Sequence, residues 1–369
     1  MIHLSPVEPN RLAVLQATIE GLGPTKAYLS GARILVTGAR GFFGRYVIDA
    51  LLMLNRHLQT KLHVYALDSM VVGPQDNWED WRGDDAITFI RHDVRHDINA
   101  KSFAGSGFTH VWHLAGIASP HWYQRLPMET IQVAVHGTEN MLKLAREHDA
   151  HFLFTSSSEV YQTASVVPTP ETYVGAIPSL TERSCYDVSK LMAETLCYVA
   201  AHRDDADISI VRIFNSFGPG MSEQDRRILP RIASAMKANR AMTVYGHRDH
   251  LPRRTYTPVA NTLLGFFLVA CKGDTIREPR AMSAAPGVYN VGLDSPEVTV
   301  VELLERVRAV TGADIRFELQ EPPTNYESEP MRRCPDITKL RKLGFAPCMD
   351  LDTGLKKFFA WADTAYTGI

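Results

Sequence analysis

The sequence predicts an α/β protein, in which a doubly wound parallel sheet is followed by a smaller C-terminal α/β lobe. From Arg33, short apolar runs alternate with amphipathic segments, the pattern of a parallel sheet covered by helices on both faces. A glycine-spaced turn directly follows the first of these runs, and beyond residue 218 shorter elements replace the strict alternation. We therefore expect an N-terminal arm (1–30), a sheet domain (31–218, with later segments at about 255–262 and 286–294) and a substrate-binding lobe (219–369).

The elements follow from the spacing of apolar residues. After the apolar run before the glycines, strands are expected at Leu62–Asp68, Ala86–Arg91, His110–Leu114, His151–Thr155, Ile208–Phe214, Met242–Tyr245 and Val288–Val291. Helices are expected from Arg45 to Met53 and at Met128–His148, Tyr186–Ala201, Leu229–Ala238 and Val300–Thr311. In the arm, apolar residues between Leu12 and Leu22 predict a short amphipathic helix that packs on a partner subunit.

The composition narrows the class of protein. At 369 residues, with 45% hydrophobic and 22% charged residues, the chain is long enough for more than one core. A net charge of −2 without a long basic run makes nucleic acid or an anionic membrane an unsuitable main partner. Five scattered cysteines without a CxxC pattern predict a reducing compartment and neither a disulfide framework nor a metal site. With no apolar run near the ~20 residues of a membrane helix and no signal-peptide pattern, the expected location is cytoplasmic.

The glycines after the first strand predict a dinucleotide site in a Rossmann-type sheet. Gly38 and Gly41 let a pyrophosphate approach the backbone at a helix N-terminus, and Gly44 lets the helix pack closely on the strand. The second strand ends in Asp68, where this fold places the acid that binds the ribose hydroxyls. Because Asp68 would repel a 2′-phosphate, NAD is the expected cofactor; Arg40 keeps NADP open as the alternative.

A tyrosine, a lysine and a run of serines later in the chain predict a site that removes a proton from a substrate hydroxyl group. Tyr186 and Lys190 stand four residues apart at a helix start and so share one face. An ammonium group and an oxidised nicotinamide ring would both lower the pKa of the phenol and make it a usable base. The strand at 151–155 runs into Ser156-Ser157-Ser158-Glu159, which places hydroxyls beside the same substrate oxygen; the alternative is a polar turn with a helix cap.

Together, these motifs resemble the extended short-chain dehydrogenase/reductase superfamily, also called the NAD-dependent epimerase/dehydratase family. The chain is most similar to the UDP-glucuronate decarboxylases (UDP-xylose synthases), from about Arg33 to Trp361. The supporting segments are Thr37–Gly44, His113–Pro120, Ser158–Tyr161, Arg183–Asp187 with Lys190, Arg212–Pro219, Val244–Gly246, Tyr289–Gly292 and Arg332–Ile337.

The resemblance implies a redox cycle on a nucleotide sugar, expected to be a UDP-sugar, in which Tyr186 removes the proton of the 4-hydroxyl. Ser157 would bond the 4-oxygen, Ser158 would line the sugar, and Glu159 would act near C5. Arg254 would meet the sugar carboxylate, although the neighbouring Arg253 is an alternative. The implied cofactor contacts also include Phe42, Phe43, Asp93, Val94, Leu114 and Ala115, and the implied substrate contacts include Ser119, Asn215, Arg227, Tyr245 and Arg333.

Simpler structural roles remain open for two of these residues. Glu159 would also suit a helix N-terminus, and Arg254 would also suit a surface or interdomain ion pair. A serine at position 158 separates the chain from 4,6-dehydratases, which usually have an aspartate there, and 4-epimerases usually lack Glu159.

The chain also departs from the decarboxylase pattern. Gln162 and Gly220 replace a usual glycine and a usual arginine, and Ala134 and Asn261 replace a usual asparagine and a usual aspartate. The loop at 246–254 is about two residues longer than usual. A 4-epimerase or 4,6-dehydratase is therefore the alternative function, and a non-catalytic NAD-binding regulator is the remote one.

The two long helices carry wider apolar stripes than one sheet face requires. They lie at Met128–His148 and Tyr186–Ala201. The surplus predicts a helix-to-helix homodimer interface, with core packing as the alternative.

Overall fold

The computed structural model describes residues 8–58, 60–72, 81, 83–98, 103, 107–246, 251–276, 285–321 and 330–368. Residues 1–7 of the predicted arm and residues 247–250 of the lengthened loop lie outside these ranges.

Seven parallel strands form the central sheet, and this confirms the predicted fold class. They are β1 (Arg33–Thr37), β2 (His63–Asp68), β3 (Ile87–Arg91), β4 (His110–His113), β5 (His151–Ser157), β6 (Ile208–Ile213) and β11 (Val288–Val291). Their order across the sheet is β11-β6-β5-β4-β1-β2-β3. The chain therefore builds outward from β1 to β3 and then returns to the other side of β1 with β4. This reversal leaves a crevice at the carboxyl ends of β1 and β4, where open α/β sheets bind ligands.

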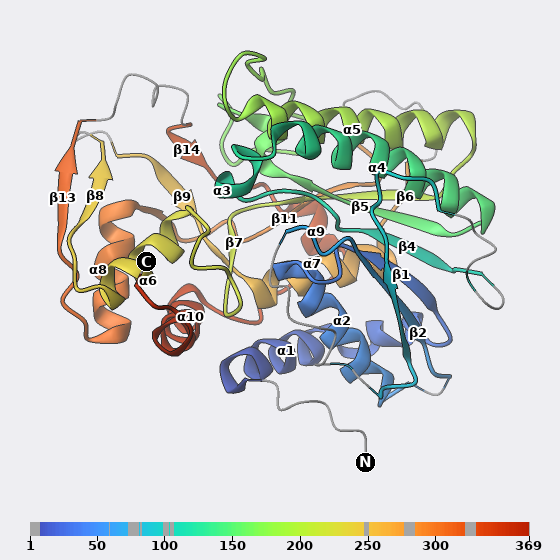
Figure 1. Cartoon of the computed structure of the whole chain (residues 1–369), viewed down its shortest axis with the longest axis horizontal. Coiled ribbons are helices and arrows are strands. Elements are labelled where there is room, and N and C mark those ends of the chain that lie inside the picture. Colours follow the sequence, from blue (N-terminus) through green and yellow to red (C-terminus); the bar gives the residue numbers. More distant parts are fainter. Residues whose placement is uncertain are drawn as a thin grey trace.

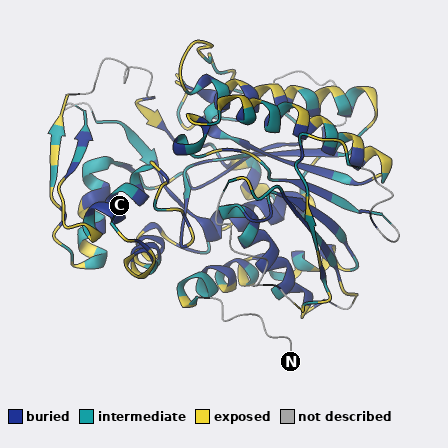
Figure 2. Cartoon of the chain, viewed as in Figure 1, coloured by how far each residue is buried: buried dark blue, intermediate teal, exposed yellow. Residues whose placement is uncertain are grey.

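Helices cover both faces of this sheet (Figure 1). One face carries α1 (Pro9–Leu22), α2 (Phe42–Asn55) and α7 (Val259–Lys272), and the other carries α4 (Pro127–Glu147) and α5 (Ser184–Arg203). Short helical turns lie at η1 (Gly23–Leu29), α3 (Pro120–Tyr123), η4 (Ser158–Tyr161) and α9 (Thr338–Lys342). The strands are buried over most of their length, whereas the outer faces of α4 and α5 are exposed (Figure 2).

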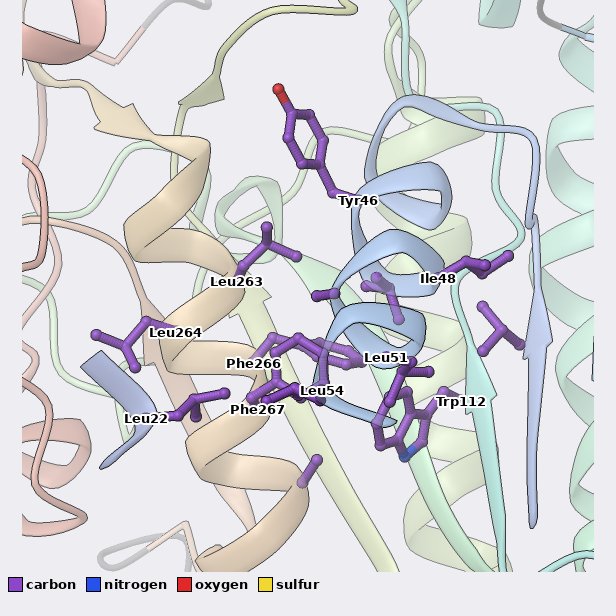
Figure 3. Close-up of a cluster of buried hydrophobic side chains, with 14 of the residues drawn as sticks. Leu22, Tyr46, Ile48, Leu51, Leu54, Trp112, Leu263, Leu264, Phe266 and Phe267 are labelled. Atoms are coloured by element: carbon purple, nitrogen blue, oxygen red, sulfur yellow. The ribbon is translucent and has the colours of Figure 1, made fainter. Parts of the chain in front are cut away.

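The core beneath α2 and α7 is packed with large side chains (Figure 3). The Trp112 ring meets Phe266 and Phe267 edge-to-face, with centroids 5.2 and 5.6 Å apart. All three residues are fully buried, and each contributes about 1.5–3 kcal/mol or more by leaving water. This packing anchors β4, whose carboxyl end borders the crevice.

The predicted N-terminal helix packs on the chain's own core instead of projecting toward a partner subunit. Leu15 and Leu22 of α1 are buried, and the Thr18 hydroxyl donates a hydrogen bond of 3.2 Å to the Ala260 carbonyl oxygen of α7. Arg11 forms an ion pair with Asp49 of α2, with Nη2 and Oδ2 2.5 Å apart. The apolar stripe was correctly expected to be buried, but α2 and α7 cover it.

The smaller lobe contains short strands and three helices. Its helices are α6 (Ile228–Lys237), α8 (Val300–Thr311) and α10 (Leu351–Ala365), and its strands are β8 (Met242–Tyr245), β9 (Arg253–Thr255), β12 (Glu297–Thr299), β13 (Phe317–Gln320) and β14 (Arg332–Arg333). Strand β8 pairs with β13, and β9 lies between β12 and β14. A parallel pair, β7 (Ser216–Phe217) with β10 (Thr257–Pro258), lies where the chain leaves and re-enters the sheet domain. The chain returns to the large sheet with α7 and β11, so the two parts are interleaved in sequence.

Within the described ranges, no helix combines the length and the apolar character that crossing a bilayer demands.

Candidate active site

A cavity of about 500 Å³ opens over the carboxyl ends of β1, β4 and β5 and is closed from the other side by the lobe. Its lining includes many of the residues expected from the sequence. They are Gly38, Gly41, Phe42, Phe43, Gly44, Leu114, Ser157, Ser158, Glu159, Tyr186, Lys190, Asn215, Arg227, Tyr245, Arg254 and Arg333.

The glycine turn forms one end of this cavity because no side chain fits there. Gly38 has φ +67°, and a Cβ atom on it would lie 2.8 Å from the Ala115 backbone. A Cβ atom on Gly44 would lie 2.1 Å from the Gly38 carbonyl oxygen. Helix α2 begins at Phe42, directly after Gly41, and no side chain caps its first N–H groups. These donors therefore remain available to an anion.

Asp68 closes the second strand beside this turn, as the sequence predicts. Its carboxylate accepts hydrogen bonds from the backbone N–H groups of Arg40 and Met70, each 2.8 Å long. Burial raises the pKa of this carboxyl group above its ordinary value, while the two backbone donors oppose the rise. The backbone thus orients the Asp68 carboxylate at the tip of β2.

Four residues expected to contact the cofactor lie outside the cavity lining: Asp68, described above, and Asp93, Val94 and Ala115. The Asp93 carboxylate is held by Arg95, whose Nη2 lies 2.7 Å from Oδ2. Val94 is buried under α4, where its Cγ2 would lie 2.8 Å from a Cβ atom on Gly137. Ala115 lies behind Gly38, and its N–H donates to the Thr37 hydroxyl at 3.1 Å. The cavity in this structure therefore does not include their side chains.

Tyr186, in the first turn of α5, lines the cavity. The Ser157 hydroxyl, at the end of β5, is hydrogen-bonded to the phenol. Burial raises the pKa of Tyr186 to about 12, and the hydrogen bond with Ser157 and the charge of Arg227 oppose this rise. The sequence predicts that Lys190 lowers this pKa, but in the structure burial outweighs every opposing effect.

Lys190 lies one turn further along α5. Its Nζ donates a 2.7 Å hydrogen bond to the Thr155 carbonyl oxygen and lies 4.8 Å from the centre of the Phe154 ring. Burial lowers the pKa of this ammonium group to about 8. A Cβ atom on Gly116 would lie 3.3 Å from Nζ, so the glycine leaves space for the ammonium group. The Lys190 ammonium group is thus held between the end of β5 and the backbone at Gly116.

Arginines surround the Glu159 carboxylate, which also lines the cavity. Arg333 Nη1 donates a short hydrogen bond to Oε1, and Arg183 Nη2 lies 2.5 Å from Oε2. The register pairs Arg333 of β14 with Arg254 of β9, so the two residues occupy the same face of the small sheet. Burial would raise the pKa of Glu159, but the positive charges of Arg333, Arg183 and Arg254 outweigh it and lower the pKa. Glu159 is therefore ionised at neutral pH.

Arg253 and Arg254 lie on opposite faces of strand β9. Arg254 lines the cavity. Arg253 points to the other face of β9, where its Nη2 lies 3.1 Å from Glu302 of α8. Arg254 is thus the arginine that can reach a ligand.

The other residues expected to bind substrate lie around the rim and floor. Asn215 has φ +38° and donates to the Thr255 carbonyl oxygen at 2.9 Å, and Arg227 is paired with Asp225 at 2.6 Å. Tyr245 lines the cavity from the end of β8. Ser119 is not itself in the lining, but its neighbours Ala118 and Pro120 are. Its buried hydroxyl has no hydrogen-bond partner among the described residues.

Sequence reasoning assigned no role to two lining residues that contact the central groups. Arg183 bonds Glu159, as described above. Tyr123 of α3 stacks on Tyr186, with ring centroids 5.6 Å apart and planes inclined by 12°. The spacing of Arg183 from Tyr186, three residues along the start of a helix, was a usable signal. No sequence signal pointed to Tyr123, because Tyr186, the residue on which it stacks, is distant in sequence.

The cavity is strongly cationic. Among its described lining residues are Lys190 and six arginines, which are Arg183, Arg226, Arg227, Arg231, Arg254 and Arg333. Glu159 is the one carboxylate in the same lining. A ligand with several negative charges is therefore the chemical match for this cavity.

The residues present fit a dinucleotide. The side-chain-free backbone at Gly38 and Gly44 and the uncapped start of α2 form one edge of the cavity that Tyr186 and Lys190 also line. The Asp68 carboxylate lies beside this edge but outside the cavity lining, where it accepts a hydrogen bond from the Arg40 N–H. This edge offers donors for a pyrophosphate and an acceptor for ribose hydroxyls.

Comparisons with known proteins identify the family of the chain. The family model for the NAD dependent epimerase/dehydratase family matches residues 34–292. UDP-glucuronic acid decarboxylase 6 of Arabidopsis thaliana is 33% identical over 332 residues, which are 90% of this chain and 89% of the relative. UDP-glucuronic acid decarboxylase 1 of Danio rerio is 32% identical, over 88% of this chain and 71% of the relative.

Solved structures share the fold at lower sequence identity. A UDP-N-acetylglucosamine 4-epimerase from Methanobrevibacter ruminantium is 21% identical with a TM-score of 0.75, over 91% of this chain and 100% of that one. A UDP-glucuronic acid 4-epimerase from Bacillus cereus, solved with UDP-glucuronic acid and NAD, is 24% identical with a TM-score of 0.74, over 90% of this chain and 100% of that one. The chain belongs to the NAD dependent epimerase/dehydratase family, and NAD is its cofactor.

Proposed function

We propose that the protein decarboxylates UDP-glucuronate, or a close relative, through a 4-keto intermediate and with internal recycling of NAD. The observation that carries this proposal is the convergence of Arg183, Arg254 and Arg333 on the Glu159 carboxylate, beside Tyr186. Three guanidinium groups gathered in one part of the cavity suit a sugar that carries its own carboxylate in addition to the diphosphate. The similarity to curated UDP-glucuronic acid decarboxylases supports the same choice.

Each side chain near the sugar 4-hydroxyl has a separate role in the first step of the reaction. Tyr186 takes the proton of the sugar 4-hydroxyl, and Ser157 bonds the same oxygen and holds it against the phenol. The backbone at Gly38, Gly41 and Gly44 would hold NAD, which would supply a reversible hydride acceptor for carbon 4. Lys190, fixed on the Thr155 carbonyl, places a positive charge beside the forming alkoxide.

The 4-ketone then makes decarboxylation possible. It lies β to the sugar carboxylate, so the electron pair of the breaking C5–C6 bond moves into the carbonyl and gives an enolate at the 4-oxygen. Carbon dioxide leaves, and C5 takes up a proton before the ketone is reduced. Ser157 and Tyr186 stabilise the oxyanion throughout, and Arg254 with Arg333 orient the carboxylate before it leaves.

The proposal is tested by incubating the NAD-loaded protein with a panel of nucleotide sugars and weighing the products by mass spectrometry. We expect UDP-glucuronate to lose carbon dioxide. Loss of water from a neutral sugar would instead indicate a 4,6-dehydratase, and an unchanged mass with inverted C4 would indicate a 4-epimerase. If no nucleotide sugar reacts, the protein is a binding module.

Arg254 and Arg253 provide a matched pair of variants. We expect Arg254→Gln to raise KM for UDP-glucuronate by about 10- to 100-fold, the effect of losing a charge-assisted hydrogen bond. Binding of neutral UDP-glucose, measured as competitive inhibition, should change far less. Arg253→Gln, which alters the opposite face of the same strand, should leave both constants at their wild-type values. Equal losses for the two ligands in Arg254→Gln would contradict a carboxylate contact.

We also propose that the protein is a homodimer joined through α4 and α5. Apolar side chains on the outer faces of these helices are exposed: Met128, Ile131, Val188, Leu191, Met192, Tyr198 and Val199. The helices pack side by side, so their outer faces form a continuous surface (Figure 1). An exposed apolar surface of this kind is typical of an interface.

The five free cysteines support a reducing compartment, which we propose is the cytoplasm.

The dimer is tested with charged substitutions. We expect Leu191→Glu together with Val199→Glu to shift the protein from dimer to monomer in sedimentation velocity, because each carboxylate would be buried in the interface. Leu180→Glu, at a fully exposed residue before α5, should remain dimeric. A wild-type protein that sediments as a monomer would contradict the proposal.

A further inference from the structure

Gln162, one of the departures from the decarboxylase pattern, has an unusual backbone conformation next to the active site. It follows η4 with φ +46°, in the left-handed region that favours glycine. The chain tolerates this conformation although the residue has a side chain, which is buried. The Gln162 side-chain amide donates a short hydrogen bond to Oδ2 of Asp187. A glycine would adopt this backbone conformation more readily, but only the glutamine side chain can bond Asp187.

Asp187 follows Tyr186 and is only 1% exposed. Its Oδ2 accepts from Gln162 and lies 3.7 Å from Arg183 Nε. Its Oδ1 is buried and has no hydrogen-bond partner among the described residues. A buried carboxylate with one unpaired oxygen is costly, whereas the protonated acid carries no net charge and needs fewer donors.

Arg183 lies between two carboxyl groups. It bonds Glu159 at 2.5 Å but Asp187 only at 3.7 Å, so Glu159 receives most of its charge. Glu159 also has Arg333, whereas Asp187 has the uncharged Gln162. Two neighbouring carboxyl groups resist simultaneous ionisation, and the less well paired one keeps its proton. In this structure that group is Asp187.

We propose that Asp187, held by Gln162, is a positioning residue that carries a proton in the resting enzyme and thereby limits the negative charge beside Tyr186. While Asp187 is neutral, Glu159 is the charged member of the two carboxyl groups beside Arg183, and Asp187 adds no negative charge that opposes formation of the Tyr186 phenolate. Once Asp187 ionises, it competes for Arg183 and makes the phenol harder to deprotonate. The activity readout of this inference rests on the proposed function; the state of the carboxyl group does not.

The surrounding charges favour this assignment. Burial raises the pKa of Asp187 to about 7, and the nearby Glu159 adds to the rise, while Arg183, Arg333 and Gln162 oppose it. The charge of Asp187 in turn raises the pKa of Tyr186. Several titratable and charged groups face Asp187: Glu159 from η4, Arg183 before α5, Cys185 and Tyr186 in α5, Arg333 in β14 and Tyr123 in α3.

The carboxyl group can be observed directly in the ligand-free protein. With aspartate labelled by ¹³C at the carboxyl carbon, an NMR pH titration should show one resonance, absent in Asp187→Asn, with a midpoint near neutral pH. In Gln162→Gly, which suits the left-handed backbone but removes the donor, the midpoint should move upward. An Asp187 resonance that titrates at the ordinary value of about 4 would overturn the proposal.

The pH dependence of kcat provides the second readout, with whichever nucleotide sugar the protein converts. Removing the charge of Asp187 should let Tyr186 ionise more readily, so Asp187→Asn should shift the rising limb of the profile to lower pH by roughly one unit. Gln162→Gly should shift it in the same direction by less. A merely structural role would lower kcat at every pH without moving the limb, and superimposable profiles would overturn the proposal.

Two control variants isolate the effect. Glu171→Gln neutralises another buried carboxyl group, which bonds the Asn290 N–H at 2.9 Å and does not line the cavity. Asp205→Gly removes a side chain from an exposed residue with φ +52°. Both should keep the wild-type profile. If the protein converts no UDP-glucuronate but the limb shifts with another nucleotide sugar, the proposed function fails and this inference stands.

Discussion

Replacing Tyr186 with phenylalanine is expected to lower kcat by about three orders of magnitude, because general-base catalysis contributes roughly 10²- to 10⁴-fold. The substitution removes the proton acceptor and the partner of Ser157 but keeps the ring that stacks on Tyr123. The glycine-lined end of the cavity is unchanged, so NAD should bind with its wild-type affinity. Steady-state turnover assays measure kcat, and isothermal titration calorimetry measures the affinity for NAD.

Tyr198 provides the control for this experiment. It lies on the same helix, is 49% exposed and does not line the cavity. Tyr198→Phe should therefore turn over substrate at the wild-type rate. A Tyr186→Phe variant that also retained this rate would remove the proposed base and, with it, the proton chemistry described above.

Replacing Arg212 with methionine is expected to destabilise the protein by roughly 3–5 kcal/mol, the usual cost of leaving one member of a buried ion pair alone. Arg212 of β6 holds Glu194 of α5 through Nε at 2.9 Å and Nη2 at 2.6 Å. Its Nη1 also bonds the Tyr161 hydroxyl at 2.7 Å. The Ser156 hydroxyl donates to Glu194 at 2.5 Å, so the pair supports the strand end that carries Ser157. Urea unfolding followed by circular dichroism measures the loss.

A double variant separates the charge from the packing. Arg212→Met with Glu194→Leu removes both charges and should recover most of the lost stability, since buried pairs are often replaceable by apolar residues. If the single and double variants unfold at the same urea concentration, the unpaired Glu194 carboxylate is not the cause of the lost stability.

Much of the fold was predictable because its strands are short, continuous apolar runs. The strands Met242–Tyr245 and Val288–Val291 and the helix Val300–Thr311 have the predicted bounds. Strands such as β9 and β14, with three and two residues, were not predicted. Elements this short contain no periodicity, so their pairing depends on tertiary contacts.

The N-terminal helix shows a second limit. The spacing of Leu15, Leu22 and their neighbours predicts a buried stripe, but no spacing says which surface covers it. Helix α7, more than 200 residues away in sequence, provides that surface. Long-range pairing of this kind cannot be read from local patterns.

In the active site, sequence motifs located the residues but not the balance of charges among them. Tyr186, Lys190 and Ser157 converge as expected, whereas burial, and not Lys190, dominates the pKa of the phenol. The roles of Arg183 and Asp187 appear only once η4, α5 and β14 are brought together. Asp93 and Val94 remain predictions as cofactor contacts. The domain boundaries likewise remain a prediction.

The central claim is that one hydride leaves carbon 4 and returns to it around a decarboxylation. The most direct measurement is the conversion of UDP-glucuronate carrying deuterium at C4, followed by mass spectrometry and NMR of the product. The account predicts a UDP-pentose that has lost carbon dioxide and retains the deuterium at C4. A decarboxylated product without the label, or recovery of unchanged labelled substrate from the NAD-loaded protein, would contradict it.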